Sequence, residues 1–196
     1  MPYPHPTGLA IVDGQAVVLD LAADRYVAIG EPGMSEEALT RALRDQGHLR
    51  NGEPLASLQP DIVPPEAEIG EGAGAQCRAR MFELLLDQLA IRTALRLGAI
   101  ARLAAPPAIA VCAERGSLEA EAAAYRDVRR LIPLPPICLA DSLAMRRWLA
   151  RRGIAVALVF GVKLSPFAAH CWLQAGSRVV NDSLDNVRPF TPILAT

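Results

Sequence analysis

Residues 133–149 read PLPPICLADSLAMRRWL, in which a proline-rich stretch runs directly into apolar residues at approximately helical spacing. Prolines cannot continue a helix, so we expect the helix to begin beside Cys138 and to end at Gly153. Cys138 is therefore predicted to lie in the first turn. The unpaired backbone N–H groups of that turn favour an anion, so they should acidify the thiol toward the nucleophilic thiolate.

Three strands are predicted after this helix. Residues 154–162 are apolar and β-branched, which is typical of a buried strand, and residues 168–173 give a second strand. Gly176 marks a turn, and residues 177–182 return as a third strand. The sequence thus predicts an antiparallel sheet that follows the cysteine-bearing helix.

The register of the predicted hairpin brings two polar residues together. With residues 175–177 as the loop, His170 lies directly opposite Asp182. Facing residues on one side of an antiparallel pair have Cβ atoms about 4.5–5.5 Å apart, close enough for a carboxylate to hold an imidazole. A loop one residue shorter would spoil this register.

Cys138, His170 and Asp182 then supply a nucleophile, a general base and an orienting acid. This order suits cysteine-dependent acyl transfer, in which His170 accepts the thiol proton and later protonates the leaving amine. Each residue alone is more often structural, for example as a small buried thiol or a satisfied core histidine. Their joint placement favours the catalytic interpretation, with the Cys138 backbone N–H as a plausible oxyanion-hole donor.

Other residues compete for these roles. Cys171 lies in the middle of a predicted strand and faces away from His170 by the two-residue period. Cys77 and Cys112 have no nearby histidine and are interpreted as core or incidental residues. Asp185 lies beyond the predicted ladder, and Trp172 is interpreted as packing beside the site.

Composition bounds the possible classes. The chain has 196 residues, of which 52% are hydrophobic and 21% charged, so we expect one folded domain or two compact ones. The longest apolar runs are shorter than the roughly 18 residues that a membrane span needs. The first residues have neither the basic nor the apolar region of a secretion signal. We therefore expect a soluble protein of the reducing cytoplasm.

Cysteine and charge usage narrow the classes further. Four cysteines without a CxxC pair, and three scattered histidines, predict neither a disulfide scaffold nor a metal site, and no cofactor is indicated. The net charge of −1 argues against a nucleic-acid binder. Residues 1–75 hold 4 Arg against 12 Asp and Glu, whereas residues 76–196 hold 16 Lys and Arg against 9 Asp and Glu. Four arginines of the second part are expected on a solvated helix face: Arg146, Arg147, Arg151 and Arg152.

The acidic N-terminal part predicts a small sheet followed by a helix. The turn residues Asp13-Gly14 separate two apolar strands, and residues 25–29 give a third. Ser35 is a candidate N-cap for a helix that ends at Gly47. A module of this size could bind a partner, but it offers no catalytic constellation.

The middle of the chain predicts a boundary and two helices. Residues 51–74 are rich in Pro, Glu and Gly and are expected to be a linker. Residues 76–104 predict one long helix with apolar residues on most faces, which implies burial. Ser117 is a candidate N-cap for a helix to residue 130. We expect a recognition domain with its linker at residues 1–75 and a catalytic domain at residues 76–196.

The segment from Pro133 to Leu194 resembles the B proteins of lasso peptide biosynthesis, which are leader-removing cysteine proteases with a transglutaminase-like core. The resemblance covers about a third of the chain and implies an α+β, transglutaminase/papain-like fold in which Cys138 is the nucleophile, His170 the base and Asp182 the acid. Asp141 departs from the pattern, since such proteins often have a basic residue there. The motifs that carry the resemblance are Cys138-Leu139, Ser142-Leu143-Ala144-Met145, Arg152-Gly153-Ile154, Phe160-Gly161-Val162, residues 166–173 (PFAAHCWL) and Val179-Val180-Asn181-Asp182.

The first 70 or so residues resemble the small winged-helix leader-recognition domain that accompanies such proteases. In that family a leader peptide adds as a strand to an exposed sheet edge. The resemblance places this edge at Tyr26, Val27, Ala28 and Ile29. Burial of this strand as ordinary core is an equally open interpretation, and the acidic balance is not explained by the resemblance.

The resemblance implies a cytosolic peptidase that cuts the leader from a ribosomal precursor peptide. It also implies a partner, an ATP-dependent lasso cyclase similar to asparagine synthetase, and neither a nucleic acid nor a membrane. Two alternatives stay open: a transglutaminase or other acyltransferase with the same triad, and a non-catalytic chaperone that binds the precursor.

Overall fold

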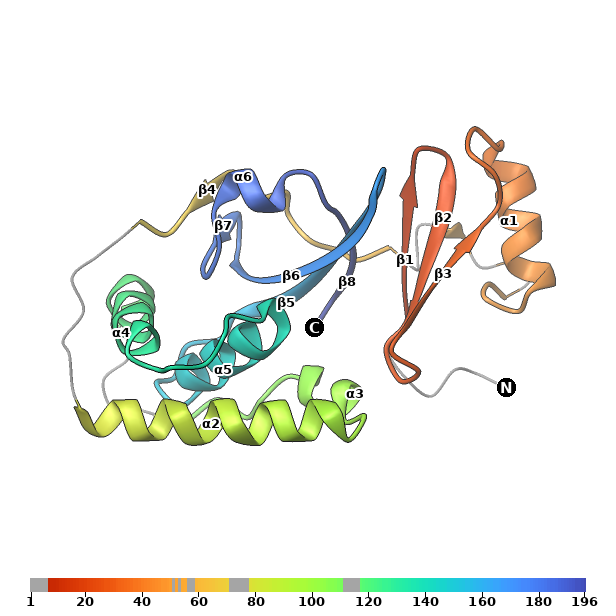
Figure 1. Cartoon of the computed structure of the whole chain (residues 1–196). Helices are drawn as coiled ribbons and strands as arrows, with labels where there is room; N and C mark the ends of the chain where they lie inside the picture. The colour runs from red at the N-terminus through yellow and green to blue at the C-terminus, as the bar shows by residue number, and fades with distance from the viewer. Residues whose placement is uncertain (1–6, 51, 53, 56–58, 71–77, 111–116) are drawn as a thin grey trace.

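The structure is a computed structural model, and it describes residues 7–50, 52, 54–55, 59–70, 78–110 and 117–196. The described residues form a mixed α and β fold with two sheets (Figure 1), as the sequence predicts. None of the helices in these ranges is both long and apolar enough to span a bilayer.

The N-terminal sheet is an antiparallel meander, and the predicted hairpin turn is confirmed. Asp13 and Gly14 have φ values of 52° and 75°, the left-handed backbone that a tight turn requires. The predicted N-cap is also confirmed, because Ser35 Oγ accepts from the amide of Ala38 at 3.3 Å. The elements are β1 (Thr7–Val12), β2 (Gln15–Asp20), β3 (Arg25–Ile29) and α1 (Glu36–Asp45).

This sheet lies between α1 and the rest of the molecule (Figure 1). The strand period divides β2 between two cores: Val18 packs with Leu39 and Leu43 of α1, whereas Val17 and Leu19 belong to the large core shared with the C-terminal part. The two parts of the chain therefore share buried apolar surface.

At Gly8 the two parts approach each other closely. A Cβ atom at this position would lie 2.1 Å from the carbonyl oxygen of Ile193 in β8 (Thr191–Ala195). Only glycine permits this separation of β1 from β8.

The second sheet has the order β4-β7-β6-β5-β8. Its long strands are β5 (Ala157–Leu164) and β6 (Phe167–Ala175), which pair antiparallel. The segment expected to be a linker supplies β4 (Ala67–Glu68), which pairs parallel with β7 (Arg178–Val179). The domain boundary at residue 75 stays a prediction.

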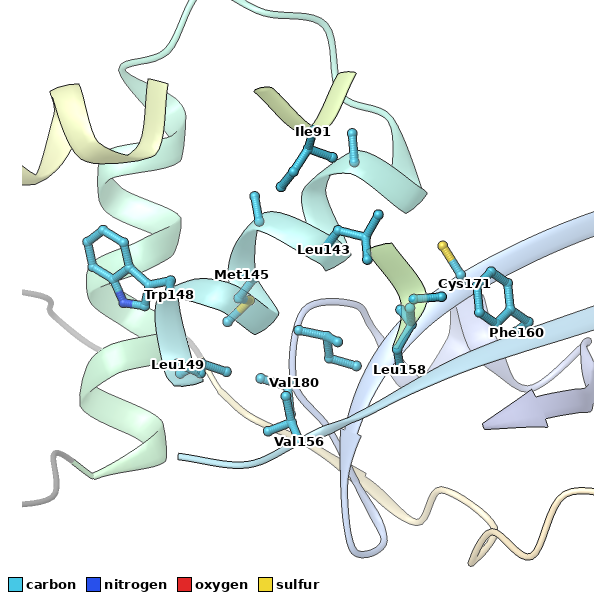
Figure 2. Close-up of a cluster of buried hydrophobic side chains, with 14 of the residues drawn as sticks. Ile91, Leu143, Met145, Trp148, Leu149, Val156, Leu158, Phe160, Cys171 and Val180 are labelled. Atoms are coloured by element: carbon cyan, nitrogen blue, oxygen red, sulfur yellow. The ribbon is translucent and has the colours of Figure 1, made fainter. Parts of the chain in front are cut away.

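Four helices complete the core of this part: α2 (Arg78–Arg96), α3 (Ile100–Ala104), α4 (Leu118–Arg130) and α5 (Cys138–Ala150). The N-cap prediction for α4 is confirmed, since Ser117 Oγ accepts from the amide of Ala120. Helix α5 is central: its buried residues Leu143, Met145 and Trp148 belong to the same core cluster as Leu158 and Phe160 of β5. In Figure 2, Leu143 lies on the side of α5 that is nearer these strand residues, and Trp148 lies farther along the helix.

The single helix expected over residues 76–104 is wrong. The chain leaves the helical path at Gly98, which has a φ of 74°, and restarts as α3. The expected burial is also wrong on one face, because Phe82, Leu86 and Leu97 are 62%, 68% and 80% exposed.

The solvated face expected for four arginines is wrong for Arg146, which is buried, and for Arg152, which is half-buried; Arg147 is half-buried and Arg151 is exposed. Arg146 is buried and donates to the carbonyls of Ala104 and Thr196. Arg151 pairs with Glu83 and Asp87 of α2, and Arg152 stacks over Trp148 and pairs with Glu121 of α4. These cations hold α5 to its neighbours.

Candidate active site

Cys138 is the first residue of α5, as predicted, and its side chain is exposed. The N-cap residue, Ile137, offers no side-chain acceptor to the first turn. The first amides of a helix have no intrahelical acceptor, so they stay available to an anion at this position.

Asp141 anchors the start of α5 from the side. Its carboxylate accepts from Arg129 Nε and Gln88 Nε2, both at 2.6 Å, and from the Ile137 amide at 3.0 Å. Arg129 also donates to the Leu134 carbonyl at 3.0 Å, in the proline-rich segment before the helix. Asp141 therefore fixes the helix start to α2 and α4.

The hairpin of β6 and β7 has a different register from the predicted one. Ala175 pairs with Arg178 and Gln174 with Val179, so the loop is Gly176-Ser177 and is one residue shorter than expected. The ladder ends at Val179, which leaves the edge of β6 open beside His170 and Cys171. The start of α5 occupies this opening, where the Cys171 amide bonds to the Cys138 sulfur.

His170 and Asp182 nevertheless meet. His170 Nε2 lies 2.5 Å from Asp182 Oδ2, because the chain bends after β7 instead of continuing as a strand. Asp182 Oδ1 accepts from the Ser183 amide at 2.7 Å and from Asn186 Nδ2 at 3.0 Å. The carboxylate is thus aimed at the imidazole by α6 (Leu184–Val187), whose N-cap is Ser183.

Asn181 joins the three elements that carry the site. Its Oδ1 accepts from the Leu173 amide of β6 at 2.6 Å, and its Nδ2 donates to Ser142 Oγ of α5 at 2.8 Å. Ser142 is fully buried and donates to the Cys171 carbonyl at 3.4 Å. This chain of hydrogen bonds ties the helix of Cys138 to the strand of His170 and to the bend of Asp182.

The electrostatics favour a charged pair. Hydrogen bonds from Cys171 and from His170 lower the pKa of Cys138 to about 4. Hydrogen bonds to Asp182 and to Cys138 raise the pKa of His170 to about 9. Burial opposes ionisation of Asp182, but hydrogen bonds from His170 and Asn186 outweigh it and lower its pKa. Between pH 4 and 9 the site therefore holds a thiolate beside an imidazolium.

Cys171 is the residue whose part in the site the sequence did not indicate. It is buried against α5 (Figure 2), and its hydrogen bond to Cys138, together with burial, raises its pKa well above the usual range. Cys171 therefore stays protonated, and its S–H group donates a hydrogen bond to the Cys138 thiolate. Its position directly after His170 in the sequence was the available signal.

The other candidates lie elsewhere. Asp185 is in α6 and pairs with Arg188 at 3.5 Å. Cys77 and Cys112 lie outside the described residues. Within the described part of the chain, no group of three or more His, Cys, Asp or Glu side chains could hold a metal ion.

The imidazole ring of His170 also packs against two aromatic side chains. The ring centroids of Trp172 and Phe190 lie 6.2 Å and 5.2 Å from that of His170. Gly161, the register partner of His170, makes room for them, since a Cβ there would lie 2.7 Å from the Trp172 ring and 2.9 Å from Phe190 Cβ. Trp172 packs beside the site, as expected.

The residues predicted to bind a peptide, Tyr26 to Ile29, form β3, an edge strand of its sheet. Val27 and Ile29 pack toward α1, and Ala28 is exposed. Tyr26 faces the other way and lines a pocket together with Cys138 and His170.

A cysteine, a histidine and a carboxylate in this arrangement are typical of enzymes that transfer acyl groups through a cysteine. Residues 83–195, more than half of the chain, match the family model of the transglutaminase-like superfamily, and the chain belongs to this superfamily.

A curated relative adds a narrower similarity. The microcin J25-processing protein McjB of Escherichia coli is 40% identical over 58 residues. This segment spans 30% of the present chain and 27% of that protein. No solved structure gives a significant match.

Proposed function

We propose that this protein is a cytoplasmic cysteine peptidase that removes the leader from a ribosomally made lasso peptide precursor. The observation that carries the proposal is His170, which is bonded to Asp182 on one side and to Cys138 on the other. Membership of the transglutaminase-like superfamily and the similarity to a protein named for processing microcin J25 support it.

Acylation begins with the Cys138 thiolate, whose sulfur attacks the carbonyl carbon of the scissile peptide bond. The oxyanion that forms accepts a hydrogen bond from the Cys138 backbone N–H at the free helix start. Nε2 of His170 is occupied by Asp182, so Nδ1 faces the sulfur and gives its proton to the departing amine. The C–N bond breaks, which leaves a thioester on Cys138 and the core peptide with a free amine.

Deacylation uses the same groups in the reverse sense. Neutral His170 takes a proton from water, whose oxygen attacks the thioester carbonyl. The C–S bond breaks and regenerates the thiolate beside the imidazolium, and the leader leaves as a carboxylic acid that gives its proton to bulk water. Asp182 stays ionised and holds the ring orientation throughout.

The N-terminal part supplies recognition in this proposal. A leader peptide adds as a strand to the edge formed by Tyr26 to Ile29, beside α1, in a winged-helix-like recognition domain of residues 1–75. The freed core amine then passes to an ATP-dependent cyclase similar to asparagine synthetase. No cofactor takes part in the cleavage.

The test is cleavage of a synthetic precursor followed by mass spectrometry. The wild-type chain should release the leader and the core as two peptides, and Cys138→Ala should release neither. Asp185→Asn serves as the matched control, because this carboxylate lies in α6 away from the imidazole. A precursor that is bound but never cut by the wild-type chain would support a chaperone instead.

An acyltransferase is a second candidate, because the superfamily match names transglutaminase-like proteins. It would use the same thioester but deliver the acyl group to an amine. Addition of a labelled primary amine to the cleavage assay separates the two. A peptidase yields mainly the free leader carboxylate, whereas a transferase yields mainly the labelled amide.

A further inference from the structure

The pocket beside Cys138 is built from both parts of the chain. Cys138, Leu139, Phe160 and His170 come from the transglutaminase-like part, and Leu19 and Tyr26 come from the N-terminal sheet. Leu19 and Tyr26 are register partners on β2 and β3, so they present one continuous wall. The N-terminal sheet therefore supplies part of the lining of the pocket that also contains Cys138 and His170.

Tyr26 is fixed in this wall by its neighbours. Its ring meets the ring of Phe167, at the start of β6, edge-on with centroids 5.8 Å apart. Burial is the main cause that raises the pKa of Tyr26 to about 12. The phenol stays neutral at every pH at which the thiolate–imidazolium pair exists.

The size and lining of the pocket indicate what it holds. Its volume is about 140 Å³, below the range of roughly 300–1,000 Å³ of pockets that bury whole small ligands. It therefore suits a single side chain. Leu19, Leu21 and Ile100 give it an apolar lining, and Asp24 with the Cys138 thiolate makes its rim unfavourable for an acidic group.

The direction of β3 indicates which side of the scissile bond this side chain belongs to. β3 begins beside the pocket at Tyr26 and runs away from it toward Ile29. A leader on this edge has to bring its C-terminal end to Cys138, so it runs antiparallel to β3. The residues that reach the pocket are then those that precede the scissile bond.

We propose that Tyr26 is a specificity-determining residue that closes a pocket for one small or medium apolar side chain preceding the scissile bond. The inference rests on the proposed peptidase function, and it assigns Tyr26 to the cleavage site instead of the leader-binding edge. The remaining edge residues, Val27 to Ile29, keep their place in the leader site.

The first test is selectivity among peptides. Precursors carry Ala, Val or Phe at each of the two positions before the scissile bond, and kcat/KM is measured for each. Tyr26→Ala enlarges the pocket and should raise the Phe-to-Val ratio about tenfold, whereas Tyr26→Trp narrows it and should lower that ratio. Ile11→Ala removes an apolar side chain from the α1 side of the same sheet and should leave the ratio unchanged.

The second test does not require peptidase activity. Cys138 is alkylated with iodoacetamide and with the bulkier N-benzyl iodoacetamide, and the ratio of the two rates is measured in the full chain. Tyr26→Ala should raise the benzyl-to-small ratio about tenfold and Tyr26→Trp should lower it. If these shifts are found in a chain that cuts no peptide, the proposed peptidase function is refuted, but Tyr26 still closes the pocket beside Cys138.

Two results would overturn the inference. One is an alkylation ratio that is the same in wild type, Tyr26→Ala and Tyr26→Trp, with circular dichroism showing that all three are folded. The other is a Tyr26→Ala variant that raises KM equally for every peptide, since that pattern belongs to a leader-binding residue.

Discussion

His170 Nε2 lies 2.5 Å from Asp182 Oδ2, three residues beyond the point where the β6–β7 ladder ends. A bend and the N-cap of α6 bring the carboxylate to the imidazole, so the contact depends on Ser183 and Asn186 and not on strand pairing. The orientation of the base is consequently separable, by mutation, from the integrity of the sheet.

Asp182→Asn tests this orientation. The amide keeps the size of the side chain but no longer stabilises the imidazolium, so kcat should fall by about 10³–10⁴-fold with little change in KM. Steady-state cleavage of the precursor measures both constants. Asp185→Asn, the matched change in α6, should behave as wild type, and equal losses in the two variants would contradict the assignment.

The pH dependence of Cys138 alkylation tests the charged pair. A lowered pKa means that thiolate is present above pH 4, so the rate should rise near pH 4 and then stay on a plateau. In His170→Ala the thiol loses one hydrogen-bonding partner and one positive charge, so the midpoint should move up toward the ordinary value of about 8.5. Iodoacetamide labelling at graded pH measures this midpoint. Equal midpoints in the wild-type chain and in His170→Ala would contradict the ion pair of Cys138 and His170.

Peptidase activity should have a second limit at high pH. His170 must be protonated to release the amine, and its raised pKa keeps the proton until about pH 9. Activity should therefore fall above pH 9 while alkylation of the thiolate continues. The two midpoints belong to the coupled pair and are measured as such. An activity profile that stays on its plateau through pH 10 would rule out His170 as the acid.

Asn181→Ala tests the hydrogen bonds that join the elements of the site. It leaves the Leu173 amide without its side-chain acceptor and removes one of the two hydrogen-bonding partners of the buried Ser142 hydroxyl, which should cost about 1–3 kcal/mol in the free energy of unfolding. Urea denaturation measures this loss. Ser142→Ala on the Asn181→Ala background should cost less than on wild type, because the two residues share one network. Strictly additive losses would contradict the coupling.

Gly161→Ala tests the packing behind the imidazole. The added methyl group would press on the Trp172 ring and on Phe190, which should cost about 1–3 kcal/mol of stability and displace His170. Gly70→Ala is the control, since a Cβ there meets nothing within 4 Å. Thermal unfolding and kcat are measured for both variants, and an unaffected Gly161→Ala would show that the rings can move freely.

Local signals in the sequence predicted most of the elements. The Asp13-Gly14 turn, the Ser35 and Ser117 caps and the prolines before Cys138 each act within a few residues, and the structure has each element where they indicate it. Short-range preferences are enough in these places because the turn, the caps and the prolines act on residues next to them in the sequence.

Features that depend on tertiary contacts were not predictable in the same way. The two-residue loop at Gly176 shifts the hairpin register, yet Asp182 reaches His170 through a bend whose course depends on Asn181 and α6. The burial of Arg146 depends on the carbonyls of Ala104 and Thr196, far away in the sequence. Tyr26 lines the pocket beside Cys138 only because the N-terminal sheet packs against the C-terminal part of the chain.

Trapping the acyl-enzyme is the most direct test of whether Cys138 is the nucleophile. The full chain is mixed with excess precursor, quenched in acid within the first turnover, and examined by intact-mass and peptide-level mass spectrometry. We expect a protein heavier by the leader acyl group, attached as a thioester to Cys138, and no adduct in Cys138→Ala. Leader release that persists in Cys138→Ala, or an adduct on Cys171 instead, would contradict this expectation.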